Sequence, residues 1–157
     1  SAPMQDYSSF PGVQALAQHP HDPGVLLGGV GALRSLPLGV DAVVSLCRLG
    51  ADEVPAAGIA DGDHIEVWLI DSANSAANPH LGYLLGQAAD AIAVLRGEGR
   101  TVLLHCVQAQ SRTPAVGALY GARHCGIPIE RAIDDVCAAL PEAQPNAAFM
   151  DALRMMC

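Results

Sequence analysis

The apolar residues of this chain gather into short runs that are separated by turn residues. Four of these runs have the length and the β-branched or apolar character of strands: 24–29, 40–47, 64–71 and 101–106. The run 101–106 is apolar almost without interruption, which is typical of a central strand covered on both faces. The first 23 residues contain four prolines and little periodicity, so we expect an irregular lead-in over 1–23.

The segments between and after these strands carry the period of amphipathic helices. We expect a short helix over 30–37 and a longer one that Asn78 caps, with Pro79 in its first turn and two glycines, Gly97 and Gly99, at its end. Three further helices are expected: one from Pro114 to about Cys125, one that opens at Pro128, and one that Asn146 caps. This order predicts an α/β domain with a central, mostly parallel sheet of four to five strands flanked by helices.

Composition narrows the class of protein. With 157 residues, of which 51% are hydrophobic and 15% are charged, the chain is long enough for one packed domain, which we place at 24–157. A net charge of -8 without any cluster of basic residues argues against nucleic acid and anionic membranes as partners. Five widely spaced cysteines without a CxxC pair favour reduced thiols and a cytoplasmic protein.

The stretch 103–116, LLHCVQAQSRTPAV, carries the strongest chemical signal. A cysteine at the end of an apolar strand, followed by a short loop and a helix start, faces an anion cradle made of backbone N–H groups. The same positive field favours the thiolate of Cys106. Arg112 can grip two phosphate oxygens at once, and the hydroxyl of Thr113 can hydrogen-bond the sulfur and help it to leave.

His105-Cys106, five residues and Arg112-Thr113 resemble the HCx5R(S/T) signature of the protein tyrosine phosphatase family, and most of all its compact dual-specificity branch. The likeness extends over roughly 24–157, and includes GVLLGGVGALRSL, VDAVVSLC, VWLIDSANSAAN and LPEAQPNAAFMDAL. The resemblance implies the phosphatase fold and hydrolysis of a phosphomonoester through a phosphocysteine intermediate. That chemistry needs no metal and no cofactor, so we expect none.

The resemblance also assigns roles outside the loop. Asp71 becomes the general acid that protonates the leaving oxygen and later activates water. The alternative is that Asp71 merely caps a loop, while Asp61 and Asp63 should lie at the opposite end of the strand. His105 is expected to support the loop backbone, because neighbouring strand residues point to opposite faces and a Cys–His dyad is therefore excluded.

The loop itself departs from the family at one position. Ala109 stands where the family usually has glycine, which costs about 1 kcal/mol or more if the backbone has positive φ and nothing otherwise. We expect the loop to bind the substrate phosphate through the following residues: Val107, Gln108, Ala109, Gln110, Ser111 and Arg112. The loop has no lysine, which favours a phosphoprotein or a simple phosphomonoester over a polyanionic inositol phosphate.

Several other residues have both a chemical and a structural interpretation. Cys47 ends a strand that should lie beside the Cys106 strand, so it is either a buried core cysteine or a redox partner that protects Cys106 as a disulfide, as in some relatives. The HPHDP segment (19–23) is interpreted as a solvated loop rather than a metal site. We expect Trp68 and Tyr83 in the core, and we expect three arginines to be at the surface or ion-paired: Arg34, Arg48 and Arg123.

Three functions fit the sequence. The leading hypothesis is a protein phosphatase that acts on phosphotyrosine, phosphoserine or phosphothreonine. The second is a phospho-binding module on the same fold that Ala109 has made inactive. A different Cys-x5-Arg enzyme, such as a low-molecular-weight phosphatase or an arsenate reductase, would have its cysteine loop near the N-terminus, whereas Cys106 lies two-thirds along this chain.

Overall fold

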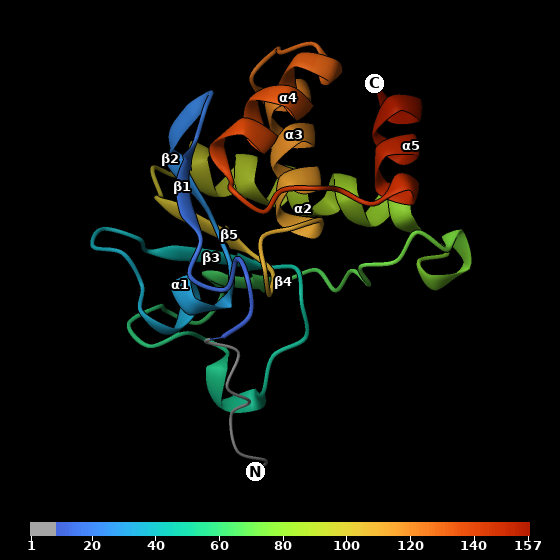
Figure 1. Ribbon diagram of the computed structural model, residues 1–157. Coiled ribbons are helices and arrows are strands. Elements are labelled where there is room, and N and C mark those ends of the chain that lie inside the picture. Colours follow the sequence, from blue (N-terminus) through green and yellow to red (C-terminus); the bar gives the residue numbers. More distant parts are fainter. Residues whose placement is uncertain (1–8) are drawn as a thin grey trace.

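A five-stranded sheet forms the centre of the molecule, which is a computed structural model that describes residues 9–157 (Figure 1). The strands lie in the order β1-β2-β5-β3-β4. Their bounds are β1 Leu16–His19, β2 Asp22–Gly28, β3 Ala42–Ser45, β4 His64–Glu66 and β5 Val102–His105. Only the β1–β2 pair is antiparallel, and the other three pairs of described strands are parallel. This confirms the expected mostly parallel α/β sheet.

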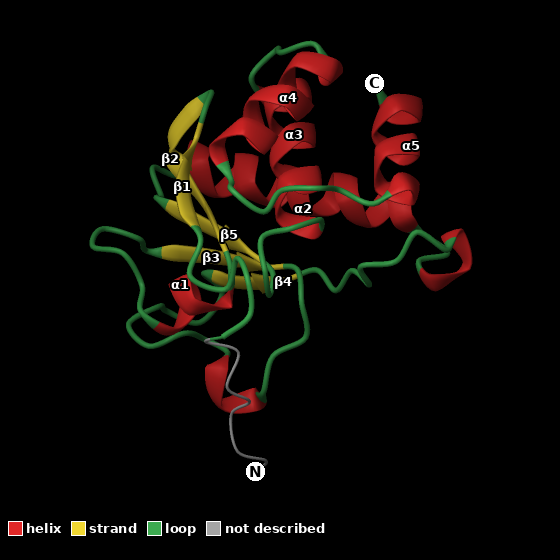
Figure 2. Cartoon of the chain, in the orientation of Figure 1, coloured by secondary structure: helices red, strands yellow, loops and turns green. Residues whose placement is uncertain are grey.

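Helices cover both faces of the sheet, as Figure 2 shows. Their bounds are α1 Val30–Arg34, α2 Leu81–Gly97, α3 Arg112–His124, α4 Ile129–Ala139 and α5 Ala147–Met156, with two short 3-10 turns at Ala51–Glu53 and Ser75–Ala77. The larger apolar core lies between the sheet and the helices α2 to α5, and the smaller core lies under α1. On β5, Val102 and Leu104 face the larger core and Leu103 the smaller one, so this strand is covered on both faces.

Helix α3 packs closely because it carries glycines on its buried side. A Cβ atom at Gly117 would lie 3.3 Å from Leu27 of β2 and 3.4 Å from Val136 of α4. At Gly121, a Cβ atom would lie 3.4 Å from the ring of His19. The ring Nε2 of His19 is therefore able to reach the carbonyl oxygen of Gly117 at 2.7 Å. This packing fixes α3, and with it the residue at its first turn, Arg112, against the sheet.

The expected lead-in over 1–23 differs from the structure. Strand β1 lies inside that segment and β2 begins at Asp22, while residues 1–8 lie outside the described part of the chain. The segment HPHDP is not a solvated loop either, because His19 is only 2% exposed. The prolines were misleading here because Pro20 lies in the turn between β1 and β2, and Pro23 precedes the residues of β2 that pair with β5.

Two further boundaries differ from the expectation. The strand expected over 64–71 has only three ladder residues, although the N–H groups of Val67 and Leu69 still donate to the carbonyls of Ser45 and Leu46 at 2.9 and 3.0 Å. Helix α2 begins at Leu81 with His80 as its N-cap, so the expected cap at Asn78 is wrong. The amide of Asn78 is used elsewhere, as described below.

The central strands end together at one edge of the sheet. Gly28 of β2 and Ser45 of β3 are both register partners of His105 at the end of β5. The residues that follow these strands therefore meet at the carboxyl edge, where ligands bind in open α/β sheets. Cys106 and Cys47 both lie at this edge.

Candidate active site

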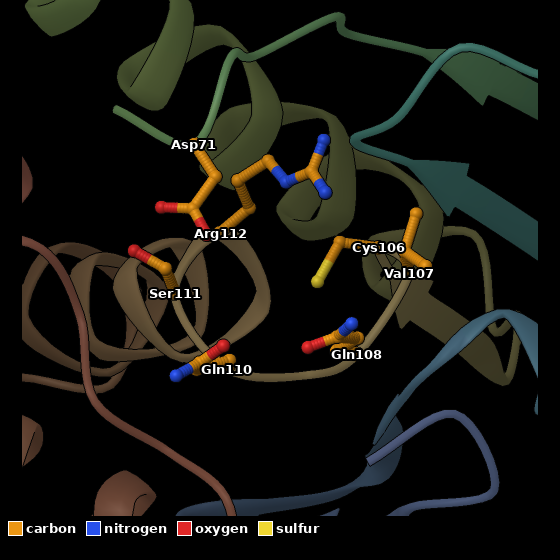
Figure 3. A pocket seen from close by; sticks show the side chains of 7 residues that line it. All are labelled: Asp71, Cys106, Val107, Gln108, Gln110, Ser111 and Arg112. Atoms are coloured by element: carbon orange, nitrogen blue, oxygen red, sulfur yellow. The ribbon is translucent and has the colours of Figure 1, made fainter. Parts of the chain in front are cut away.

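The loop between β5 and α3 surrounds the sulfur of Cys106. Figure 3 shows this sulfur pointing into the space that the loop encloses, with Asp71 on the other side of Arg112. The space is a cavity of about 250 Å³. It is lined by Asp71, Cys106, Val107, Gln108, Gln110, Ser111 and Arg112. The structure thus brings together the expected loop residues and Asp71 at one cavity, while Ala109 does not line it.

The carbonyl groups of the loop are held by donors outside it. His105 Nδ1 lies 3.0 Å from the Cys106 carbonyl oxygen. The carbonyl of Val107 accepts the N–H of Val30 at 2.9 Å, and that of Gln110 accepts the N–H of Gln144 at 2.6 Å. Because the N–H and C=O of one peptide point in opposite directions, these bonds leave the next N–H groups facing the cavity. Such a ring of donors, next to the positive N-terminus of α3, attracts an anion.

Two glycines outside the loop let other segments approach its backbone. A Cβ atom at Gly12, where φ is +79°, would collide with the carbonyl oxygen of Gln108. A Cβ atom at Gly29 would collide with the carbonyls of Gly12 and Val13 and lie 2.8 Å from that of Val107. Sequence reasoning missed this backing layer. The signals were the glycine before α1 and the glycine in a segment interpreted as irregular.

Thr113 and Arg112 contribute donors from the first turn of α3. The hydroxyl of Thr113, fully buried, lies 3.0 Å from the sulfur of Cys106 and 3.2 Å from the carbonyl oxygen of Gly28. Since the hydroxyl has one proton, it donates to one of these acceptors at a time. Arg112 donates from one terminal nitrogen to the carbonyl of Leu69 at 3.2 Å. Its Nε is buried and, within residues 9–157, has no hydrogen-bond partner.

Asparagine side chains position the segment that carries Asp71. One oxygen of the exposed Asp71 carboxylate accepts a hydrogen bond from Asn146 Nδ2 at 2.8 Å. The N–H of Asn146 donates to the Ser111 hydroxyl at 2.9 Å, and its Oδ1 caps α5 through the N–H of Phe149 at 2.9 Å. Asn146 therefore connects the expected general acid and the last helix through its side chain, and the loop through its backbone N–H.

Asn78 acts on the residue before Asp71. Its side chain accepts the N–H of Ile70 at 2.9 Å and donates to the carbonyl of Ile70 at 2.7 Å. A pair of bonds to one residue fixes the extended backbone that delivers Asp71 to the cavity. The sequence indicated helix caps at Asn78 and Asn146, and it gave no signal of these additional contacts.

His105 lies behind the loop and not beside the sulfur. Burial lowers the pKa of its fully buried imidazole to about 4, so the ring is neutral at physiological pH. Its Nε2 lies 2.6 Å from the hydroxyl of Ser45 on the neighbouring strand β3. The ring therefore contacts a loop carbonyl and Ser45, and the supporting role that the resemblance implies stays a prediction.

Ala109 adopts the left-handed conformation, with φ of 53°. The strained alternative of the two that the sequence left open is therefore the one observed. The conformation still lies in the small left-handed region that L-residues can occupy, at a cost of about 1 to 2 kcal/mol. The methyl group is fully buried and belongs to the larger core. The strain thus lowers stability, while the carbonyls of Cys106, Val107 and Gln110 keep their outward bonds.

Cys47 lies at the same edge of the sheet in a different environment. It is free and only 3% exposed. Burial raises the pKa of its thiol to about 11, and the charge of a Cys106 thiolate adds to the shift. Asp61 and Asp63 precede β4, as expected, and Asp63 pairs with Arg100 at 2.6 Å.

The expected core positions of Trp68 and Tyr83 are wrong. Trp68 is 53% exposed and Tyr83 is 72% exposed. Along the extended segment after β4, Val67 and Leu69 point inward, so Trp68 and Ile70 point to solvent. Arg48 lies over the Trp68 ring, 5.2 Å from its centre. An exposed aromatic and an exposed isoleucine therefore lie on the segment that leads to Asp71.

Comparison with known proteins gives consistent results. No family model matches the chain. Mouse dual specificity phosphatase 28 is 31% identical over 130 residues, which cover 81% of this chain and 76% of the relative. The crystal structure of a putative mouse dual specificity phosphatase complexed with zinc tungstate shares 25% identity, with a TM-score of 0.74, over 99% of this chain and 91% of that one. The PTP-2 phosphatase of Cydia pomonella shares 27% identity, with a TM-score of 0.72, over 92% and 91%.

The described residues were compared with the requirements for a membrane-spanning helix and for a metal site. None of the helices within 9–157 is long and apolar enough to cross a membrane. The same residues contain no group of three or more histidine, cysteine, aspartate or glutamate side chains that could hold a metal ion.

Proposed function

The chain belongs to the dual specificity phosphatase family, and from this premise we propose that it hydrolyses phosphoproteins with Cys106 as the nucleophile. The observation that carries the proposal is the cavity itself. It combines a sulfur, a ring of loop N–H groups and the unpartnered Nε of Arg112. A phosphate group is the ligand whose oxygens would satisfy all of these donors at once.

In the first step, the Cys106 thiolate forms a bond to phosphorus while the bond from phosphorus to the leaving oxygen breaks. Arg112 and the loop N–H groups stabilise the negative charge on the phosphoryl oxygens, which such fixed donors do more strongly in a closed cavity than in water. Asp71 gives its proton to the leaving oxygen. The bond from Asn146 to one carboxylate oxygen supports this role, because it leaves the other oxygen available to carry that proton.

In the second step, water attacks the phosphocysteine and the bond between sulfur and phosphorus breaks. Asp71, now a carboxylate, accepts a proton from the water. The negative charge returns to the sulfur, and the Thr113 hydroxyl 3.0 Å away donates a hydrogen bond to it. Inorganic phosphate leaves, and the thiolate is ready for another cycle.

The charge and the shape of the rim support a phosphoprotein substrate. Of the described residues that line the cavity, only Arg112 carries a positive charge, which suits a single phosphate group better than several. The exposed Trp68 and Ile70 offer apolar area to residues that flank a phosphoresidue in a polypeptide. Arg48, stacked on Trp68, offers a positive charge to acidic neighbours of that residue.

We extend the proposal to the domain and the compartment. The described residues from β1 onward would act as a single phosphatase domain, because β1 pairs with β2 and contributes to the same sheet. Five free cysteines support work in a reducing compartment such as the cytoplasm. A phospho-binding module without turnover is less well supported, because the strain at Ala109 leaves the outward bonds of the loop carbonyls intact.

Turnover of para-nitrophenyl phosphate tests the proposal with three proteins. We expect the wild type to hydrolyse it and Cys106→Ser to lose at least about a thousandfold in kcat, since no other thiol lines the cavity within the described residues. Asp71→Ala should lose about a hundredfold or more with poor leaving groups, where protonation matters most. Binding of a phosphopeptide without wild-type turnover would support the inactive module instead.

A further inference from the structure

A line of four hydrogen bonds connects the outer strand β4 to the nucleophile loop. The N–H of Ala56 donates to Nδ1 of His64 at 2.9 Å, and Nε2 of His64 lies 2.8 Å from the hydroxyl of Ser45. That hydroxyl lies 2.6 Å from Nε2 of His105, whose Nδ1 lies 3.0 Å from the carbonyl oxygen of Cys106. The line crosses three neighbouring strands, β4, β3 and β5.

The direction of every bond in this line is fixed by its two ends. A backbone N–H can only donate, so Nδ1 of His64 is an acceptor and the proton of the neutral ring lies on Nε2. Nε2 then donates to the Ser45 oxygen, which leaves the hydroxyl proton for Nε2 of His105. At the other end, a carbonyl can only accept, so Nδ1 of His105 carries the proton. All four bonds thus run from Ala56 towards Cys106.

We propose that His64 is a positioning residue, which acts through Ser45 and His105 to hold the Cys106 carbonyl away from its own sulfur. By donating to Ser45, His64 fixes the hydroxyl as a donor to His105. His105 is thereby held in the tautomer that can donate to the carbonyl. The proposal rests on the nucleophilic role of Cys106 proposed above, and it adds a residue on another strand to the machinery.

The surroundings of the two rings support this assignment. Burial lowers the pKa of both His64 and His105, to about 4 for the latter, so both rings are neutral at physiological pH and each has one donor and one acceptor nitrogen. Ser45 is fully buried, so its hydroxyl has no water to replace a lost partner. The strand pairing does not need these side chains, because β3 and β4 are already joined through backbone bonds.

The experiment measures how fast iodoacetamide alkylates Cys106 as a function of pH, by quantifying the peptide that contains it. We compare the wild type with Ser45→Ala, His64→Phe and the double variant. Each change interrupts the line, so the carbonyl is less firmly held and the thiolate is less favoured. The midpoint of alkylation should rise by about one pH unit, the size expected for one lost hydrogen bond.

The decisive result is that the three variants share the same shift. If His64 acts through Ser45, its removal changes nothing once Ser45→Ala has broken the line. His64→Gln keeps an N–H donor towards Ser45, and we expect it to restore most of the wild-type profile. A double variant whose shift is the sum of the single shifts, or single variants with the wild-type midpoint, would overturn the proposal.

His21→Phe is the matched control. His21 is half-buried, as His64 is, but its Nε2 lies 2.8 Å from a carboxylate oxygen of Asp135, outside the line. Its replacement should lower the melting temperature without moving the alkylation midpoint. If His64→Phe does not fold, the smaller change His64→Ala, alone and combined with Ser45→Ala, tests the same dependence. Alkylation needs no turnover, so an inactive wild type would contradict the proposed function and leave this test in force.

Discussion

Cys106 and Cys47 follow neighbouring strands at the same edge of the sheet and have opposite surroundings. They follow the paired parallel strands β5 and β3, and both are almost fully buried, at 2% and 3% exposed. The sulfur of Cys106 faces the Thr113 hydroxyl at 3.0 Å and shares a cavity with Arg112. At Cys47, burial raises the pKa of the thiol to about 11. Burial and position in the fold therefore do not determine which thiol can act as a nucleophile.

The difference arises from the chain that follows each strand. After β5, six residues lead directly to the N-terminus of α3, so the backbone turns its N–H groups around the sulfur. After β3, the chain passes through a long irregular segment with one 3-10 turn before it reaches β4. No α-helix of the described structure begins within that segment. At Cys47, burial outweighs the opposing effects of Arg112 and of its own backbone N–H, so the pKa of the thiol is raised. The short loop and the helix thus distinguish the surroundings of the proposed nucleophile from those of Cys47.

The largest expected difference between the two cysteines is in catalysis. Thr113→Val removes the hydroxyl beside the Cys106 sulfur, and we expect kcat to fall by about 10- to 100-fold, the value of one hydrogen bond to a charged group. Cys47→Ser should keep kcat within about twofold. Steady-state hydrolysis of para-nitrophenyl phosphate measures both. Burst kinetics would locate the loss for Thr113→Val in breakdown of the phosphocysteine.

The same pair of variants can contradict this comparison. If Cys47→Ser lost as much activity as Thr113→Val while keeping its melting temperature, Cys47 would belong to the catalytic machinery. A valine variant with wild-type kcat would mean that the loop N–H groups alone stabilise the leaving sulfur. Circular dichroism melts of both variants show whether folding is affected.

A smaller difference concerns oxidation. If Cys47 is the redox partner of Cys106, peroxide first converts the Cys106 thiolate to a sulfenic acid, and the Cys47 thiolate then attacks its sulfur and releases hydroxide. With a pKa of about 11, Cys47 has about one thiolate in ten thousand at pH 7. We therefore expect disulfide formation to be slow at pH 7 and to accelerate about tenfold per pH unit up to pH 9. The oxidation is quenched at a series of times, and the disulfides in each sample are identified by peptide mapping under non-reducing conditions.

The outcome decides between the two interpretations of Cys47. A bond between Cys106 and another cysteine, or overoxidation of Cys106 without a link to Cys47 at any pH, would leave Cys47 as a core residue. A rate that levels off near pH 8 would contradict the raised pKa of its thiol. Cys47→Ser is the control that must abolish the bond, whereas the exposed Cys157 should be dispensable.

The sequence predicted the parts of the site that lie close together in the chain. The strand, loop and helix around Cys106 can be predicted from the spacing of nearby apolar residues and from Pro114 in the first turn of the helix, so their order did not require the structure. Asp71 required the resemblance, because no local rule distinguishes it from Asp61 or Asp63. The parallel register of β3 and β5 then brings Cys47 and Cys106 to one edge.

The contacts that hold the loop from outside could not be predicted in this way. Asn146 reaches Asp71 across 75 positions and His64 reaches the loop through Ser45, and such pairs leave no periodic trace in one sequence. Trp68 was expected in the core. Alternate residues of an extended segment point to opposite sides, and Trp68 lies on the side that faces solvent. Gly12 looked like part of an irregular lead-in until the structure set it against Gln108.

The smallest expected effect is at Ala109, where glycine is usual in the family. Ala109→Gly removes about 1 to 2 kcal/mol of left-handed strain, but it also loses a buried methyl worth about 0.8 kcal/mol and frees the unfolded chain by about 0.5 to 1 kcal/mol. The net change in the free energy of unfolding should be below about 1 kcal/mol, and kcat should stay within about threefold.

A matched change in α3 separates these contributions. Ala118 is also buried but helical, so Ala118→Gly loses the methyl and the helix propensity without relief of strain, and should destabilise by about 2 kcal/mol. Denaturant unfolding of both variants gives the difference, which is the strain at Ala109. If Ala109→Gly instead raised kcat tenfold, alanine would be distorting the N–H ring around Cys106. The outward bonds of the loop carbonyls argue for the first result, because they fix the ring from outside residue 109.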